Sequence, residues 1–433
     1  GFESLPHRHF YVVMYFMNKN NLIIILIIII FDFIFSQLFL LDFLNKEKEQ
    51  IYKEIAENRI HNSEYRYGFK KNATFNTLWK KKIVYEINTN NLGFRDFSNR
   101  NLNKKKNYSI IIGDSFVEGV GLTYDNTITG LLNSKLTNEQ FSNFEFLNAG
   151  VASYSSYIYL KKIKSVLNAN KWLKVSSVVV LHDKSDLLDD LAYLKMNKPS
   201  EFEIEDRKYE NRRKHSFYDD LKNYNFWRFY RKQTMIGLLL DNIGNRIEDF
   251  FRNLRDRYKL ASKNNKNFFE IKKYQIRAIR SVNSMKGTKK FYYNKKKWND
   301  EGIKSLNFTI ENLLELKNYL NARNIKLYVL LYPYSYEILE DDPRFLYLNS
   351  VVPKLEENNI NYLNAYPKFF IGDLYKNIDN FYIYNDVHYN ELGNLLLTDI
   401  IFNEIYKREN WYCFYISFNN PISMNPDLTQ YDY

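Results

Sequence analysis

The stretch Tyr108-Ser-Ile-Ile-Ile-Gly-Asp-Ser-Phe-Val-Glu-Gly-Val-Gly-Leu122 decides the fold of this chain. Its apolar, β-forming residues end abruptly at Gly113-Asp114-Ser115, and further glycines follow. The pattern predicts a buried strand that leads into a tight turn, with the hydroxyl of Ser115 at the carboxyl end of the strand. In open α/β sheets, ligands bind at that end of the strands.

Short apolar strands and amphipathic helices alternate along the rest of the chain. Strands that are apolar throughout, rather than in alternation, are typical of a parallel sheet buried on both faces. We therefore expect an α/β fold of three layers, a parallel sheet with helices on both sides. The strands are predicted at 144–147, 175–181, 326–331 and 361–363, and the helices at 127–136, 157–167, 302–320 and 392–406.

Residues 187–300 interrupt this alternation and are rich in Lys, Arg, Asn and Tyr. Helices are predicted within them at 221–230, 235–258 and 268–281. We interpret the segment as a helical insertion or lid over the carboxyl edge of the sheet, where it would shape a substrate cleft. The alternative is a solvated insertion without a function. The other expected segments are an N-terminal tail (1–21), a stem and lead-in (45–107), two core parts (108–186 and 301–407) and a C-terminal tail (408–433).

The run from Leu22 to Leu44 is almost wholly apolar. At 1.5 Å per residue it is roughly 35 Å long, enough to cross a bilayer with some tilt. Asp32 within it costs about 2.5–3.5 kcal/mol on insertion scales, and the many Ile, Leu and Phe residues, at about −0.3 to −0.6 kcal/mol each, outweigh that cost. We expect an uncleaved, single-pass transmembrane helix, with the C-terminal domain outside the cytoplasm, that is, periplasmic. A buried core helix or a cleaved signal peptide are the alternatives.

Composition excludes several classes of protein. The formal net charge is +12, but the lysines are scattered and no nucleic-acid-binding signature is present, so we expect no nucleic-acid partner. The single Cys413 excludes an intramolecular disulfide framework and a cysteine-rich zinc site. Asp386, His388 and Glu391 have no second histidine at helical spacing, so we expect no metal site there.

A serine hydroxyl needs a neighbouring base to become a nucleophile, and imidazole is the usual one. Six histidines are available, and His388 lies in Tyr384-Asn-Asp-Val-His-Tyr-Asn-Glu-Leu-Gly393, directly before the last predicted helix. A histidine in such a turn can reach the carboxyl end of another strand. Taken alone, it is more often a structural or surface residue.

Four segments together resemble the conserved blocks of the SGNH (GDSL-type) hydrolases, which are serine esterases and acyltransferases on a flavodoxin-like sheet. They are Gly113-Asp114-Ser115, Asn148-Ala149-Gly150, His182 to Asp190 and Asn385 to His388. The resemblance implies that Ser115 is the nucleophile and His388 the base. It also implies an oxyanion hole made by the amides of Ser115 and Gly150, with Ser185 as a third donor.

Two positions depart from the family pattern. Three residues before His388, where the family has aspartate, stands Asn385, and Asp386 follows it. Either Asp386 orients the imidazole, or the site is a Ser115–His388 dyad oriented by Asn385 or the backbone. The third block lacks its asparagine, and Ser185 is nearest to that place; loss of one oxyanion donor can cost about 10²–10³ in rate.

The resemblance implies an O-acyl esterase or transferase, of O-acetyl groups on a cell-envelope glycan, that needs no cofactor. Asn90 to Asp96 supports the glycan assignment, since it resembles a segment of membrane-anchored SGNH proteins from bacterial glycan loci; the alternative there is a turn with a solvated Arg95. The expected partners are an acylated carbohydrate or other ester and, through Leu22–Leu44, the membrane. The two departures also leave open a catalytically silent module that binds or scaffolds glycan-assembly partners.

Overall fold

The computed structural model describes residues 19–36, 38, 41–80, 83–138, 143–195, 234–282, 295–339 and 346–407. The chain divides into two compact units. The first, called here the N-terminal unit, comprises 1–57 and 198–272, and the second, the sheet unit, comprises 58–197 and 273–433. The predicted insertion 187–300 is therefore shared between the two units. The predicted helix at 221–230 and the tail 408–433 lie outside the described residues.

An eight-stranded sheet forms the centre of the sheet unit, in the order β10-β9-β8-β6-β7-β5-β4-β3. Five strands are parallel: β6 (Asn107–Ile112), β7 (Phe144–Asn148), β8 (Lys174–His182), β9 (Lys326–Leu331) and β10 (Asn361–Asn364). Numbered along the chain, their order is 2-1-3-4-5, which is the flavodoxin-like order. The prediction of a mostly parallel α/β sheet is confirmed, and the first strand, β6, lies at its switch point between β7 and β8.

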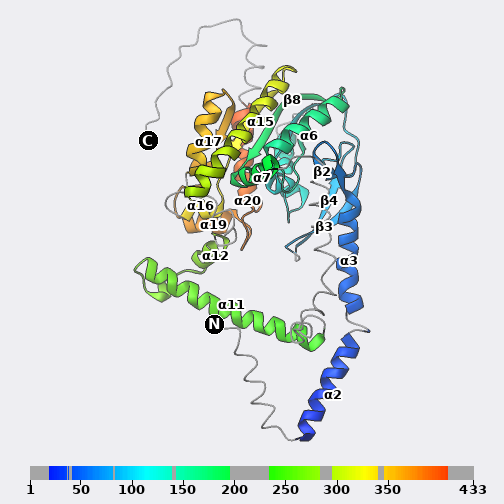
Figure 1. Cartoon of the computed structure of the whole chain (residues 1–433), viewed down its shortest axis with the longest axis vertical. Helices are drawn as coiled ribbons and strands as arrows, with labels where there is room; N and C mark the ends of the chain where they lie inside the picture. Colours follow the sequence, from blue (N-terminus) through cyan, green and yellow to red (C-terminus); the bar gives the residue numbers. More distant parts are fainter. Residues whose placement is uncertain are drawn as a thin grey trace. The chain divides into compact units, whose positions relative to one another are not determined.

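Helices cover both faces of this sheet, as the three-layer prediction requires (Figure 1). Ile111 of β6 and Val179 of β8 belong to one buried cluster with Leu132 of α5 and Leu397 of α20. Successive strand residues point to opposite faces, so Ile110 and its neighbours face the other layer, in which α15 packs against α6, α7 and α17. The helices are α5 (Ile128–Asn138), α6 (Ser156–Ala169), α7 (Lys184–Lys195), α15 (Ile303–Asn321), α17 (Leu346–Glu357) and α20 (Glu391–Ile401).

Shorter elements complete the sheet unit near the ends of the strands. Among them, α12 packs against α16 and α19. They are α4 (Ser115–Glu118), α12 (Lys273–Val282), α14 (Lys295–Lys297), α16 (Ser335–Leu339), α18 (Tyr366–Phe369) and α19 (Leu374–Phe381), with 3-10 turn η2 (Tyr124–Asn126) and π-helical turns η5 (Trp298–Gly302) and η6 (Phe402–Lys407).

The segment predicted as stem and lead-in is largely sheet. β1 (Arg59–Asn62) and β2 (Arg66–Phe69) form a separate hairpin, and β3 (Thr74–Trp79), β4 (Ile83–Thr89) and β5 (Arg95–Asp96) extend the central sheet as antiparallel strands. β5 joins the parallel strands through a single pair, Arg95 with Asn148. β3 and β4 alternate between buried and more exposed residues, as one-sided strands do. The sequence interpretation missed all of these strands.

The N-terminal unit contains α2 (Lys19–Phe35), α3 (Leu41–Asn58), of which residues up to 57 belong to it, the long α11 (Met235–Lys263) and 3-10 turn η3 (Phe268–Glu270). The predicted transmembrane helix at 22–44 does not appear as one element, because α2 ends at Phe35 and α3 begins at Leu41. Within the described ranges, no helix combines the length and the apolar character needed to cross a membrane.

Candidate active site

The strand β6 and the turn after it place Ser115 at the carboxyl edge of the sheet. A Cβ at Gly113 would lie 2.4 Å from Val117 Cγ2 and 3.1 Å from the carbonyl oxygen of Leu181, so only glycine fits there. Asp114 then caps α4, since its Oδ1 accepts the N–H of Phe116 at 2.9 Å. Ser115 is the first residue of this short helix. The local sequence thus turns the chain sharply and leaves the serine hydroxyl at the sheet edge, as predicted.

Ser115, His388 and Asp386 form one hydrogen-bonded chain. The Oγ of Ser115 lies 2.7 Å from Nε2 of His388, and Nδ1 of the same ring lies 2.7 Å from Oδ1 of Asp386. His388 and Asp386 are buried, at 7% and 2% exposure. A neutral imidazole that donates from Nδ1 to a carboxylate has its Nε2 lone pair available for the serine proton. The arrangement is that of a nucleophile, a base and an orienting carboxylate.

The loop before α20 holds the base and its carboxylate. Asp386 Oδ1 also accepts the N–H groups of Val387 (2.6 Å) and His388 (3.2 Å). Asn385, at φ 57°, takes part through its backbone: its N–H donates to Ser281 Oγ of α12 at 3.1 Å. Of the two alternatives left open by the sequence, the structure therefore has Asp386, one residue later than the family position, against the imidazole.

Two residues from the end of β3 support Asp386 from its other side. Trp79 donates from Nε1 to Asp386 Oδ2 at 2.6 Å, and its ring packs edge-on against His388 at 4.8 Å between centroids. Lys80 Nζ lies 3.1 Å from the same Oδ2 and donates to the carbonyl of Asn385 at 2.6 Å. Burial alone would raise the pKa of Asp386, but the hydrogen bonds from His388 and Trp79, together with the charges of His388 and Lys80, hold that pKa well below its usual range. The carboxylate is therefore ionised at neutral pH.

Sequence reasoning missed Trp79 and Lys80. They lie more than three hundred residues before Asp386, in a segment predicted as a stem. Recognising the alternating pattern of β3 and β4 would have placed this hairpin beside the sheet, but not these side chains against the catalytic loop.

Arg95 holds the turn that follows Ser115. It is 1% exposed, and it donates to the carbonyls of Glu118 (2.5 Å), Gly119 (2.8 Å) and Leu122 (2.6 Å). The alternative of a solvated arginine is therefore wrong. The segment Asn90–Asp96 is a structural support of the nucleophile turn.

Gly150, a predicted oxyanion donor, lies against α4. A Cβ on it would be 2.5 Å from Val117 Cβ and 2.7 Å from the amide nitrogen of Glu118, so the close approach requires glycine. Its N–H donates to Asn148 Oδ1 at 3.1 Å, while Asn148 Nδ2 donates to the carbonyl of Val117 at 2.7 Å. The amide is therefore placed beside the nucleophile helix but already has an acceptor.

Ser185, the third predicted donor, is also engaged. Its Oγ donates to Asp183 Oδ1 at 2.7 Å and accepts from the hydroxyl of Tyr334 at 2.9 Å. Its N–H donates to the same carboxylate oxygen at 2.6 Å. A serine hydroxyl has one proton to donate, so in this arrangement Ser185 has none left for an oxyanion.

A group of buried carboxyls lies behind Ser115. The oxygens of Asp114, Asp183 and Asp186 all lie within 4.8 Å of one another. Burial raises the pKa of each, and the charge of Asp183 raises the pKa of Asp114 and Asp186 further. Tyr332 donates to Asp183 at 2.8 Å and Tyr159 to Asp186 at 3.0 Å. Carboxyls this close together with raised pKa values can share protons, and the same spacing would also suit a cation. The sequence analysis did not predict this cluster.

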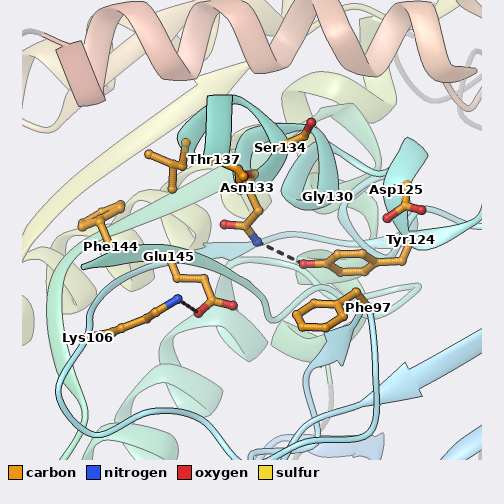
Figure 2. A pocket seen from close by; sticks show the side chains of 11 residues that line it. Phe97, Lys106, Tyr124, Asp125, Gly130, Asn133, Ser134, Thr137, Phe144 and Glu145 are labelled. Carbon is orange, nitrogen blue, oxygen red and sulfur yellow. Dashed lines mark hydrogen bonds and ion pairs between the residues drawn. The ribbon is translucent and has the colours of Figure 1, made fainter. Parts of the chain in front are cut away.

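A cavity of about 630 Å³ lies beside α5 and the start of β7, and Figure 2 shows the side chains that line it. Within it, Asn133 Nδ2 donates to the hydroxyl of Tyr124 at 3.1 Å, and Lys106 pairs with Glu145 at 3.2 Å. Its lining does not include Ser115, His388 or Asp386, so we assign it no part in the chemistry of the triad. It is lined by Phe97, Lys106, Tyr124, Asp125, Gly130, Asn133, Ser134, Leu136, Thr137, Phe144 and Glu145.

Comparison with known proteins finds similarity among solved structures alone. No family model and no curated protein matches the chain. Among solved structures it is similar to the acetyl xylan esterase AlAXEase, with 14% identity over 69% of this chain and 99% of that one and a TM-score of 0.36. It is also similar to the psychrotrophic esterase EstA from Pseudoalteromonas sp. (12% identity, 70% and 100% covered, TM-score 0.31) and to a GDSL-like lipase from Bacteroides thetaiotaomicron (11%, 70% and 89%, 0.31).

These solved structures are esterases and a GDSL-like lipase by their own descriptions. The identities and TM-scores are low, so no activity is transferred from these proteins. The function proposed below rests on the geometry of Ser115, His388 and Asp386.

Proposed function

We propose that the chain is a serine esterase or acyltransferase of the SGNH type, which takes O-acyl groups, in particular O-acetyl groups, from a cell-envelope glycan. The observation that carries the proposal is the continuous hydrogen-bonded chain from Ser115 Oγ through both nitrogens of His388 to Asp386. Such a relay is what activates a serine hydroxyl at neutral pH.

The reaction has two halves. His388 Nε2 takes the proton of Ser115 as Oγ forms a bond to the acyl carbonyl carbon, and the carbonyl oxygen becomes an oxyanion. His388 then returns the proton to the departing alcohol oxygen as the ester C–O bond breaks, which leaves an acyl-Ser115 and a free hydroxyl. Water or a second sugar hydroxyl, deprotonated by His388, attacks the acyl-enzyme in the same way. Asp386 stabilises the imidazolium in both halves.

The resemblance assigns the oxyanion to the amides of Ser115 and Gly150. Gly150 would exchange its bond to Asn148 for one to the oxyanion, because its single N–H already donates to Asn148 Oδ1. Ser185 would have to give up its bond to Asp183 before it could contribute.

The glycan substrate and the location outside the cytoplasm are parts of the same proposal. They are supported by the apolar run Leu22–Leu44 and by the resemblance of the motifs. A reporter that is active only outside the cytoplasm, fused after residue 433, would test the orientation; lack of signal from a stable fusion contradicts it.

Hydrolysis of p-nitrophenyl acetate, with and without a glycan acceptor, tests the activity directly. We expect Ser115→Ala to lose activity by about 10³-fold or more. Ser350→Ala, whose hydroxyl only bonds the carbonyl of Leu346 within α17, should equal the parent. An active Ser115→Ala variant would exclude Ser115 as the nucleophile. Faster release of nitrophenol with acceptor present, accompanied by an acylated acceptor, identifies a transferase.

A second function is favoured by one specific observation: the proposed donors Gly150 and Ser185 both have acceptors within the protein. If these bonds persist with ligand present, the fold is a silent module that binds acylated glycan or scaffolds its assembly. Covalent labelling of Ser115 by a fluorophosphonate contradicts this function, whereas a protein that retains glycan but resists labelling supports it.

A further inference from the structure

The helix α11 presents a long apolar face that its own unit leaves exposed. It has 29 residues and is therefore about 43 Å long. Most of its large apolar side chains are more than half exposed: Leu239 (59%), Ile247 (53%), Phe250 (58%) and Phe251 (63%) among them. Figure 1 shows it as a single uninterrupted helix. Contiguous exposed apolar surface of this extent marks an interaction site.

The apolar residues of α11 lie on one side of the helix. At about 100° per residue the exposed ones, from Met235 to Tyr258, fall within an arc of roughly 160°, and the less exposed Leu238 and Leu260 fall beyond one edge of it. All four acidic residues fall in the opposite half, where Arg252 pairs with Glu248 and with Asp249. Arg246 and Arg257, in contrast, fall inside the apolar arc, within about 40° of the same edge. Apolar and aromatic side chains accompanied by arginines, with the carboxylates turned away, suit a lipid surface that carries anionic head groups.

The start of α11 is attached to the apolar helix α2 of the same unit. Asp32 accepts the N–H of Ile236 at 3.2 Å, and Ser36 Oγ accepts the N–H of Met235 at 2.8 Å. Thr234 accepts the next N–H, of Gly237, at 3.0 Å. The first three N–H groups of α11, which would otherwise have no partner within the helix, are thus bound by side chains. Asp32, a costly residue in an apolar run, is 5% exposed and caps a helix.

The surface of α2 is apolar and exposed on all sides, as Ile24 (55%), Ile27 (59%) and Phe31 (68%) illustrate. Asp32 lies in the last turn of α2, three residues before its end at Phe35. The apolar face of α11 therefore begins where the apolar surface of α2 ends. Two apolar surfaces joined at a capped helix end are most simply covered by one apolar medium.

We propose that α11 is an interfacial membrane helix, which lies along the surface of an anionic bilayer with Ile247, Phe250 and Phe251 in the lipid, and which Asp32 and Ser36 hold to α2. The inference is independent of the catalytic proposal. A membrane contact of this kind would place the long axis of α11 in the plane of the membrane, at a depth of about 5–10 Å.

Spin labels on the full-length chain test this proposal without any reading of activity. In a Cys413→Ser background, single nitroxide labels are placed at Ile247→Cys and Phe251→Cys, and matched control labels at Glu248→Cys and Arg252→Cys on the polar face. The protein is reconstituted into vesicles of phosphatidylcholine and phosphatidylglycerol in equal amounts. Collision rates with oxygen, which concentrates in lipid, and with a water-soluble nickel chelate are then measured.

We expect the oxygen-to-nickel ratio at 247 and 251 to exceed that at 248 and 252 by at least about threefold, as for an immersed face. Equal nickel access on both faces overturns the proposal, because the apolar face is then in water. Protection of 247 and 251 from both reagents overturns it too and indicates a protein partner, with spin–spin broadening if that partner is a second copy. When Ile243→Glu and Leu254→Glu are added to the Ile247→Cys variant, the oxygen-to-nickel ratio at 247 should fall to that measured at 248 and 252.

Discussion

The two sides of Ser115 differ in how completely they are built for catalysis. On the base side, His388 and Asp386 are aligned at 2.7 Å, and Trp79 and Lys80 bind the far oxygen of the carboxylate. On the oxyanion side, Gly150 and Ser185 both donate to side chains of the protein. The hydrogen bonds that the proposed proton transfer uses are therefore already present in the structure, whereas stabilisation of an oxyanion by Gly150 or Ser185 requires hydrogen bonds to be exchanged. Preorganised donors are usually the larger source of rate enhancement, so the oxyanion side sets the activity that this site can reach.

The largest effect is expected from a substitution on the base side of Ser115. Asp386→Asn should lower kcat for p-nitrophenyl acetate by about 10³–10⁴-fold, because an amide cannot hold the imidazole in the tautomer that accepts a proton at Nε2. The double variant Asn385→Asp/Asp386→Asn, which exchanges the two residues, should not recover the lost activity. The reason is that His388 Nδ1 forms its hydrogen bond with residue 386. Recovery of activity in the double variant would instead favour residue 385 as the orienting group.

A smaller effect is expected from the support of the carboxylate. Trp79→Phe keeps the ring against His388 but removes the donor to Asp386 Oδ2. A hydrogen bond to a charged group contributes about 1.5–3 kcal/mol, so we expect kcat to fall by about 10- to 100-fold. Trp79 is a positioning residue, so KM should stay unchanged; a rise in KM alone contradicts that role. Trp172→Phe, whose ring centre lies 5.9 Å from Lys104 Nζ, serves as the matched control.

On the oxyanion side, Ser185→Ala should change kcat by no more than about threefold, because the hydroxyl donates to Asp183 in the resting structure. A loss of about 10²–10³-fold would show that Ser185 turns to the oxyanion during the reaction. Steady-state kinetics with circular dichroism to verify folding separates these two outcomes, and so measures how far the two sides of Ser115 really differ.

The smallest effect concerns the acidic residues behind the oxyanion side, and it depends on pH. Burial, with the charges of Asp190 and Asp183, raises the pKa of Asp189 to about 7. Between that value and the unfolded value of about 4, the folded state binds more protons than the unfolded state, so stability falls as the pH rises through this window. Asp189→Asn should therefore raise the melting temperature at about pH 8 but not at about pH 5. The exposed Asp125→Asn should show no such difference, and an equal shift at both pH values for Asp189→Asn would contradict the assignment.

The parallel part of the fold follows from the sequence, because its strands are continuous apolar runs. β9 begins and ends at the predicted residues, and β6, β7, β8 and β10 extend the predicted strands by one or two residues. α11 was predicted to end at 258 and continues to Lys263. A continuous apolar run indicates a buried strand, and apolar residues at a spacing of three or four indicate an amphipathic helix. Both patterns are visible in a single sequence.

The antiparallel strands were not predicted, because β3 and β4 are short, half exposed, contain polar residues such as Asn76 and Asn88, and are separated by three lysines. Ser115 and His388 were found through motif resemblance, but the choice between Asp386 and Asn385 depends on a loop conformation, with Asn385 at positive φ, that composition does not reveal. Asp114 is far along the chain from Asp183 and Asp186, and it meets them only because β6 and β8 are neighbours. Contacts of this kind are set by topology.

The three carbonyl bonds of Arg95 have a consequence for the limits of the catalytic unit. These hydrogen bonds connect the turn after Ser115 to the antiparallel segment that precedes β6. Trp79 and Lys80, from the same segment, form hydrogen bonds with the loop of Asp386. A shortened protein that begins at Asn107 would retain every parallel strand together with Ser115, His388 and Asp386, but it would lack both sets of hydrogen bonds. The smallest fragment that keeps the site as the structure shows it must therefore reach back at least to β3, and the residues before β6 are part of the candidate active site rather than a spacer.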